Sequence, residues 1–251
     1  MLPAGALAAA ASPYEVTASY SGNANYEPSS ATLTQTVTLD ATTTAVTVAP
    51  KSLVTDSAAT LHAVISPAVH LPLRPGGTVT FTVTGKSGDQ LSCTAGNAAQ
   101  VVGTSAYCLL PAGVLKTSDA PYSVSASYSG DGNYAGSSAS ASLAIAPRTT
   151  RLTVRSSANP VAPAAQVTFS ATLVPANRDP APVTGTVTFS IGGGTVTCGG
   201  GNVAALVDDV ATCSVPAGAL AARSSYAVTA TYSGSGDYLA SSAALTERTS
   251  N

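Results

Sequence analysis

The sequence is short of the residue types on which most catalytic and nucleic-acid-binding sites depend. In 251 residues it has no tryptophan, one methionine and two histidines, and only 9% of its residues are charged. An average globular protein has about 25% charged residues, so Ser and Thr hydroxyl groups must cover much of this surface. The formal net charge of −2 provides no basic stripe for nucleic acid or an anionic membrane. No apolar run approaches the roughly 18 residues that a membrane helix needs, so we expect no direct membrane insertion.

What the sequence does contain is an internal repeat. Three segments align without a gap, and their shared tyrosines Tyr20, Tyr128 and Tyr232 are 108 and 104 residues apart. A period of about one hundred residues is too long for a solenoid and indicates an array of whole domains. Because an array of similar domains needs no chemistry of its own, the repeat argues against an enzyme. The three segments are Ser12–Ala31, Ala120–Ala139 and Ser224–Ala243.

Apolar and polar residues alternate along much of the chain, which is the pattern of half-buried β-strands. Residues 78–83 read TVTFTV and residues 186–191 read TVTFSI, which places Phe81 and Phe189 on buried faces. No segment has a convincing helical period over the length of a helix. Seven or so short strands in about a hundred residues predict an all-β fold of tandem immunoglobulin-like β-sandwiches. The same alternation covers residues 59–65, 122–128, 167–173 and 226–232, and Pro-rich connections are expected at 67–77 and 175–185.

The repeat predicts two complete sandwiches and part of a third. We place Ig-like domains at residues 39–146 and 147–251, and we interpret residues 1–38 as the C-terminal hairpin of a truncated domain. A lone hairpin is marginal in water, so this segment should be poorly ordered or lean on the next sandwich. The connections at residues 37–44 and 145–151 are short and contain few glycines, which predicts an extended rod.

The first residues resemble repeat sequence more than a secretory signal. Leu2–Leu7 reads LPAGAL and matches the LPAGVL of Leu110–Leu115. The start also lacks the positive charges with which a signal peptide begins. We therefore expect the chain to be part of a longer multidomain protein.

Each predicted sandwich contains two cysteines that are 15 positions apart: Cys93 with Cys108, and Cys198 with Cys213. Their equivalent places in homologous units predict two intradomain disulfides, each clamping two neighbouring strands across a loop. Metal ligation and free buried thiols are the alternatives, but zinc usually needs four ligands and no histidine lies near either pair. Closing a loop of about 15 residues stabilises by roughly 3 kcal/mol. Disulfides also imply export to an oxidising space.

The two histidines give no repeated catalytic group. His62 stands between the inward-facing apolar residues of its predicted strand and aligns with Ser170 of the next repeat. We therefore expect its side chain on the surface. His70 lies in a loop and aligns with Arg178. Without a repeated histidine, a Ser-His-Asp or Cys-His arrangement cannot be built in both domains.

Oxygen-rich hairpin tips and glycine clusters were the remaining candidates for ion or phosphate binding. Each tip has at most one carboxylate and the first tip has none, whereas calcium needs six to eight ligands, so turn formation is the better interpretation. The glycine clusters have no P-loop lysine and open no helix. The tips are Asn23 with Asn25, Asp131 with Asn133, and Asp237, and the glycines are Gly192–Gly194 and Gly199–Gly201.

Most tyrosines are expected in the core and in hairpin packing. Tyr122, Tyr128, Tyr226 and Tyr232 fall on the buried alternation of one strand, where one can form a tyrosine corner. Sugar binding needs exposed aromatic platforms. Only Tyr107, Tyr134 and Tyr238 remain as candidates for that role.

The segments YSVSASYSGDGNYAGSSA and YAVTATYSGSGDYLASSA, together with GTVTF at Gly77–Phe81 and Gly185–Phe189, resemble the tandem bacterial Ig-like repeat domains. The resemblance covers nearly the whole chain. It implies an Ig-like sandwich, an extracellular setting and a role as a stalk or adhesive module, and it brings no catalytic residues. The chain departs from antibody domains because it lacks the core tryptophan and because its cysteines lie away from the usual inter-sheet position.

The leading functional hypothesis is a non-catalytic structural or adhesive module, an extracellular stalk or spacer in a secreted or surface protein of a bacterium. Its partner would be an unknown surface ligand, protein or glycan. No catalytic, cofactor-binding or metal-ligating residue is predicted, and no cofactor. The alternative is a carbohydrate-binding accessory module of a secreted enzyme. An enzyme is the third possibility, and it would need a pocket shared between domains.

Overall fold

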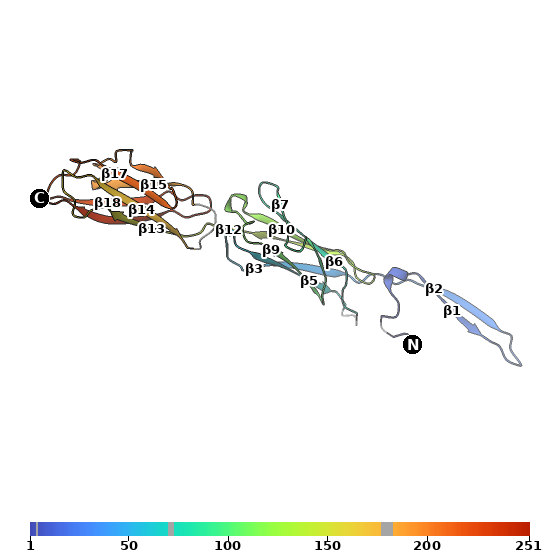
Figure 1. Cartoon of the computed structure of the whole chain (residues 1–251). Helices are drawn as coiled ribbons and strands as arrows, with labels where there is room; N and C mark the ends of the chain where they lie inside the picture. Colours follow the sequence, from blue (N-terminus) through green and yellow to red (C-terminus); the bar gives the residue numbers. More distant parts are fainter. Residues whose placement is uncertain (4, 70–72, 177–182) are drawn as a thin grey trace. The chain divides into compact units, whose positions relative to one another are not determined.

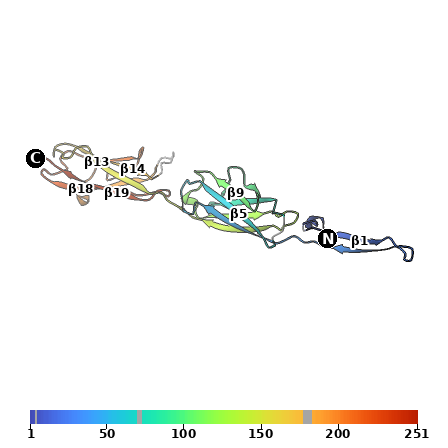
Figure 2. The same ribbon diagram turned by 90° about the horizontal axis from the view of Figure 1, so that it is seen from below.

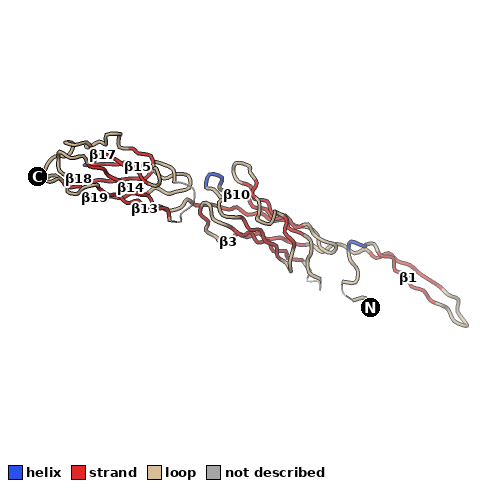
Figure 3. Tube along the Cα trace, viewed as in Figure 1, coloured by secondary structure: helices blue, strands red, loops and turns tan. Residues whose placement is uncertain are grey.

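The computed structural model describes residues 1–3, 5–69, 73–176 and 183–251. Strands dominate the described chain, and its helical segments are three short 3-10 turns (Figure 3). These turns are η1 Ala9–Ala11, η2 Thr117–Asp119 and η3 Gly192–Gly194. The predicted all-β class of tandem Ig-like sandwiches is confirmed.

The chain divides into two compact units. Residues 1–53, 57–115 and 119–144 form the first unit, and residues 54–56, 116–118 and 145–251 form the second. The limits 1–38, 39–146 and 147–251 of the individual domains stay a prediction.

The first unit contains a sandwich of two antiparallel sheets (Figures 1 and 2). One sheet has the order β3-β5-β9, with β3 Thr42–Ala49, β5 Ala59–Pro67 and β9 Ser105–Leu110. The other has the order β11-β10-β6-β7, and β8 also pairs with β6. Its strands are β6 Thr78–Thr84, β7 Gln90–Leu91, β8 Ala98–Gln100, β10 Tyr122–Tyr128 and β11 Ser137–Leu143.

The alternation of side chains explains why these strands pack. In β6 the residues Val79, Phe81 and Val83 are almost fully buried, whereas the threonines between them are exposed or half-buried. Ala126 of β10 lies opposite Phe81, which leaves room for the ring beside a small side chain. Burying such apolar side chains stabilises a fold by about 1.5–3 kcal/mol each. The sequence pattern therefore decides which face of each strand enters the core.

The second unit contains a sandwich built on the same plan. One sheet has the order β13-β14-β17 and the other the order β16-β15-β18-β19. Outside the sandwiches, β4 Leu53–Val54 and β12 Ile145–Ala146 form a separate two-stranded sheet. The sandwich strands are β13 Thr150–Ser156, β14 Val167–Pro175, β15 Thr186–Ile191, β16 Val203–Ala205, β17 Val210–Val215, β18 Ser225–Tyr232 and β19 Ser241–Arg248.

The N-terminal hairpin joins β1 Tyr14–Tyr20 to β2 Ser29–Gln35, and within the described chain these strands pair only with each other. Val16 is 43% exposed, whereas its counterpart Val124 in β10 is fully buried. The backbone N–H of Ala10 donates to the carbonyl oxygen of Gly132 (3.0 Å). This contact is of the kind expected if residues 1–38 pack against the following sandwich.

The chain enters both sandwiches through the same pair of backbone hydrogen bonds. In the first unit, the N–H of Asp40 donates to Asn133 O and the N–H of Ala135 donates to Asp40 O, both at 2.8 Å. In the second unit, Arg148 makes the equivalent bonds with Asp237 and Leu239, again at 2.8 Å. The residue two positions before the first strand of each sandwich is thus hydrogen-bonded to the hairpin tip of the same sandwich.

Each sandwich contains one disulfide, Cys93–Cys108 and Cys198–Cys213, with Cα–Cα distances of 5.5 and 5.4 Å. The predicted clamp of two neighbouring strands is wrong. Cys93 lies in the loop between β7 and β8, whereas Cys108 lies in β9 of the other sheet. The loop reaches β9 because Thr94 N–H and its hydroxyl both donate to Leu109 O, at 2.9 and 2.7 Å.

An asparagine four residues after the first cysteine orders this loop in both sandwiches. The Oδ1 of Asn97 accepts a hydrogen bond from Cys93 N–H (2.7 Å), and its carbonyl oxygen accepts one from Phe81 N–H (2.8 Å). Asn202 makes the same bonds with Cys198 and Phe189, both at 2.8 Å. The sequence signal is Cys-x-x-Gly-Asn, which the cysteine spacing alone did not reveal.

Replacing Asn202 with alanine is expected to lower the free energy of unfolding of the second unit's sandwich by about 1–3 kcal/mol, because the N–H of Cys198 loses its partner. Urea unfolding of the oxidised full chain measures the change. Asn25→Ala is the control, since this exposed side chain should leave unfolding unchanged. An Asn202→Ala chain that unfolds like wild type would show that the side chain does not order the loop.

Candidate functional site

His62 is a surface histidine of β5, as expected from the alternation. Its ring stacks on Tyr107 of β9, with 4.5 Å between ring centroids and an interplanar angle of 4°. Its Nε2 lies 3.1 Å from Ser105 Oγ. Among the described residues, no hydrogen bond joins His62 to a carboxylate of the kind that orients the histidine of a catalytic triad. His70 lies outside the described residues.

The hairpin tips are held by turns of the Asx kind. The Oδ1 of Asp131 accepts hydrogen bonds from the N–H groups of Asn133 (2.8 Å) and Tyr134 (2.9 Å), and Oδ2 accepts one from Gly76 (2.6 Å). Asn23 accepts equivalent bonds from Asn25 and Tyr26. Because backbone groups occupy these oxygens, the tips serve turn formation, and the turn interpretation agrees with the geometry.

Asp237, at the tip in the second unit, has different partners. Its Oδ1 accepts hydrogen bonds from the hydroxyl groups of Thr55 (2.8 Å) and Thr117 (2.6 Å), both of which belong to this unit. Burial alone would raise the pKa of the Asp237 carboxyl, but these hydrogen bonds and the charge of Lys116 outweigh it and lower the pKa. The carboxylate therefore works as a structural acceptor.

Across the part of the chain that the structure describes, no three His, Cys, Asp or Glu side chains come together in a way that could hold a metal ion. The glycines Gly192–Gly194 form a 3-10 turn after β15, and Gly201 closes the disulfide loop by donating to Cys198 O. Among these same described residues, none of the helices has the length and apolar character to cross a membrane.

Two of the three tyrosines that we considered as exposed platforms for sugar binding are buried. Tyr134 and Tyr238 are 1% and 7% exposed, because the hairpin tips fold back and bury their rings. The hydroxyl group of Tyr134 donates to Leu73 O (2.6 Å). Tyr107 is the one candidate of the three that is exposed, at 59%.

The equivalent strand tyrosines differ in their hydroxyl partners. Tyr232 donates to Thr184 O (2.6 Å), in the manner of a tyrosine corner. The buried hydroxyl group of Tyr128 has no partner within the described residues. Burial, and then the nearby charge of Asp131, raise the pKa of Tyr128 to about 12.

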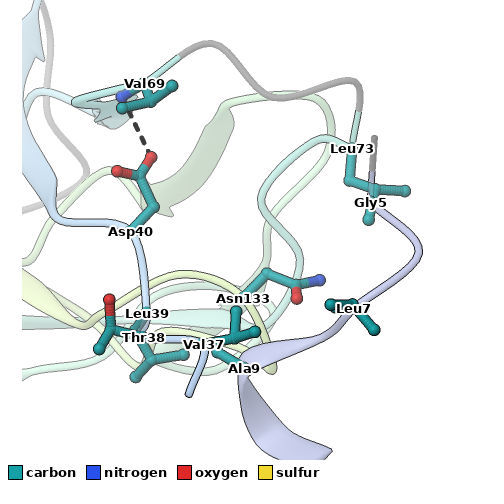
Figure 4. Close-up of a pocket in the computed structure, with 10 residues that line it drawn as sticks. All are labelled: Gly5, Leu7, Ala9, Val37, Thr38, Leu39, Asp40, Val69, Leu73 and Asn133. Atoms are coloured by element: carbon teal, nitrogen blue, oxygen red, sulfur yellow. Dashed lines mark hydrogen bonds between the residues drawn. The ribbon is translucent and has the colours of Figure 1, made fainter. Parts of the chain in front are cut away.

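A cavity of about 310 Å³ lies in the first unit, beside the N-terminal segment (Figure 4). Its lining combines apolar side chains, among them Leu7, Leu39 and Leu73, with the polar side chains of Thr38, Asp40 and Asn133. The one carboxylate there, Asp40, accepts a hydrogen bond from Val69 N–H through Oδ2 (3.1 Å). Among the described residues of the lining, this carboxylate is the one acidic side chain, and a backbone N–H already binds it.

The second unit buries a carboxylate that the sequence analysis did not single out. Glu247 of β19 is fully buried, and neither of its oxygens has a hydrogen-bond partner within the described residues. It lies opposite Tyr226, and Leu143 lies opposite the equivalent Tyr122 in the first unit. Burial raises the pKa of Glu247, and the nearby Ser156 side chain offsets part of this rise. The signal in the sequence was a glutamate where the preceding repeat has leucine.

The family model of the bacterial Ig-like domain, group 3, matches residues 152–250. Residues 152–250 are a bacterial Ig-like domain. This confirms, for that part of the chain, the resemblance stated from sequence. No curated protein matches the chain. The family supports a non-catalytic structural or adhesive module.

Several solved structures are similar to the chain at low sequence identity. A tetra-tandem repeat from the extending region of a large adhesion protein is 19% identical with a TM-score of 0.41, over 94% of this chain and 56% of that one. The Yersinia pseudotuberculosis adhesin InvE is 16% identical with a TM-score of 0.35, over 81% and 58%. The Escherichia coli adhesin FdeC is 15% identical with a TM-score of 0.33, over 88% and 69%. The chain thus spans little more than half of the first two, and likeness at this level supports no statement about function.

Replacing Glu247 with leucine is expected to raise the free energy of unfolding of the bacterial Ig-like domain at pH 7 by about 1–3 kcal/mol, the usual cost of a buried polar group without a partner. The raised pKa means that the folded state favours the protonated carboxyl group. The part of the destabilisation that comes from ionisation is therefore absent below the ordinary pKa of 4.5, and it grows as the pH rises from there through the folded-state pKa. The gain from leucine should shrink as the pH is lowered from 7 to 4.5.

Urea unfolding of the full chain at several pH values measures this gain. Glu27→Gln, at an exposed site in the hairpin segment, is the control and should change nothing at any pH. Equal stability of Glu247→Leu and wild type at pH 7 would show that the buried carboxylate carries no cost.

Proposed function

We propose that this chain is a stalk or spacer segment of a secreted or surface protein of a bacterium, built from Ig-like sandwiches that hold another part of the protein away from the cell. The observation that carries this proposal is that both sandwiches repeat the same stabilising features. Both sandwiches have the same disulfide loop, the same asparagine and the same backbone bonds at their entry. Repeated devices of this kind serve folding and mechanical strength rather than chemistry.

The chemistry of the chain supports an extracellular setting. Disulfides persist in oxidising spaces and are rare in the cytosol, and each sandwich closes its own bridge. The low charge and the surface rich in Ser and Thr suit a part that is exposed to solvent without attracting polyanions. The partner of such a part would be a surface ligand, either a protein or a glycan.

Small-angle X-ray scattering of the oxidised full chain tests the spacer function. A rod-like particle should give a radius of gyration well above about 18 Å, the value for a compact globule of this length. The short connections predict that this value changes little with temperature below unfolding. Inserting four glycines after Ala146 is the matched control and should broaden the distribution of distances. A wild-type radius near 18 Å would contradict the proposal.

A further inference from the structure

Tyr107 is an exposed aromatic side chain whose ring orientation is fixed. It lies on β9 directly opposite His62 of β5, and the two rings stack almost in parallel. The ring is 59% exposed even though one face is covered by the imidazole. A stacked neighbour restricts the rotamers of the ring, so less conformational entropy is lost when a ligand packs on its other face.

Tyr107 borders a hollow of about 440 Å³. The hollow lies between β9 and the chain from Cys93 to Gln100, which includes the disulfide loop and β8. Small residues make up most of the opposite wall, namely Ala95, Gly96, Ala98 and Ala99. The hollow thus has a flat aromatic ring at one border and little side-chain bulk at the other.

Polar groups border the same hollow. Leu109 O accepts the bonds from Thr94 at the free edge of β9, and backbone groups two residues away along a strand point to the same edge. The N–H and C=O of Tyr107 therefore face this edge beside the ring, and the exposed Gln100 side chain adds an amide. Among the described residues that line the hollow, none carries a charge.

We propose that this hollow binds a β-linked glucan or N-acetylglucosamine oligosaccharide, with one sugar ring on the free face of Tyr107. Sugars of this configuration present axial C–H groups on a flat face, which packs against an aromatic ring, while their equatorial hydroxyl groups point outward to amides and backbone groups. The lack of a cation in the lining disfavours a phosphorylated or acidic ligand. At this edge of β9, Ser105 already bonds to Val102 and Leu109 to Thr94, so the stretch between them is too short to add a peptide strand.

The second unit provides an internal comparison. Its register pairs Ser170 with Thr212, where the first unit has the stacked histidine and tyrosine. The disulfide loop there reads Gly199–Gly201 and has no aromatic neighbour on the strand. The site is therefore a property of the first unit alone, and it goes beyond the spacer function, which both sandwiches share.

The test is isothermal titration calorimetry of the full chain with cellotetraose and with chitotetraose. One of them should bind to wild type at millimolar concentration or better. Tyr107→Ala should weaken that binding at least tenfold, and Tyr107→Phe, which keeps the ring face, by less than threefold. His62→Ala should weaken it severalfold without lowering the thermal unfolding temperature by more than a few degrees, because His62 positions the ring.

Tyr26→Ala is the matched control, since Tyr26 is also an exposed tyrosine, at 69%, and its loss should leave binding unchanged. Failure of both sugars to titrate would overturn the proposal. So would wild-type affinity in Tyr107→Ala, or an equal loss in Tyr26→Ala. Scattering from the same samples reports on the spacer function separately, because a rod that binds neither sugar contradicts only the binding site.

Discussion

The tie between the two sheets at the Cys-x-x-Gly-Asn loop is the constraint on which each sandwich depends. The chain has no tryptophan and three phenylalanines, so small aliphatic side chains fill most of each core and give limited apolar area. The disulfide holds the loop of one sheet to the edge strand of the other, and Asn97 satisfies the backbone N–H of Cys93 inside that loop. The carbonyl group of the same asparagine then continues the hydrogen bonding to β6 at Phe81.

The two copies of this loop show which residues the geometry requires. Their middle residues differ, Thr-Ala in one and Gly-Gly in the other, yet the glycine and asparagine that follow are retained. Gly96 and Gly201 have φ values of +86° and +89°, a region that residues with a side chain rarely adopt. The glycine therefore makes the turn and the asparagine satisfies the backbone N–H of the cysteine. The residue after the cysteine can vary because its backbone N–H makes the bond to the strand in both copies, Thr94 to Leu109 and Gly199 to Ser214.

The strands and the cysteine pairing could be predicted from the sequence, whereas the surroundings of single side chains could not. Alternation identified the buried faces of β6 and β15 because burial along a strand has a period of two. It could not place Cys93 off the strand, because the loop is shaped by Asn97. Nor could it show that Tyr134 is buried, because that depends on Leu73, 61 positions away, whose carbonyl group accepts the hydroxyl bond.

The N-terminal hairpin shows how far local sequence determines burial. Its strands pair in the register of β10 and β11, with Tyr20 opposite Ser29 as Tyr128 is opposite Ser137. The pairing therefore follows from the segment itself. Tyr20 is nevertheless 46% exposed and Tyr128 only 3%, because β10 also pairs with β6 and packs against a second sheet, which β1 lacks. The segment encodes a hairpin with an apolar face, and only the presence of another sheet makes that face part of a core.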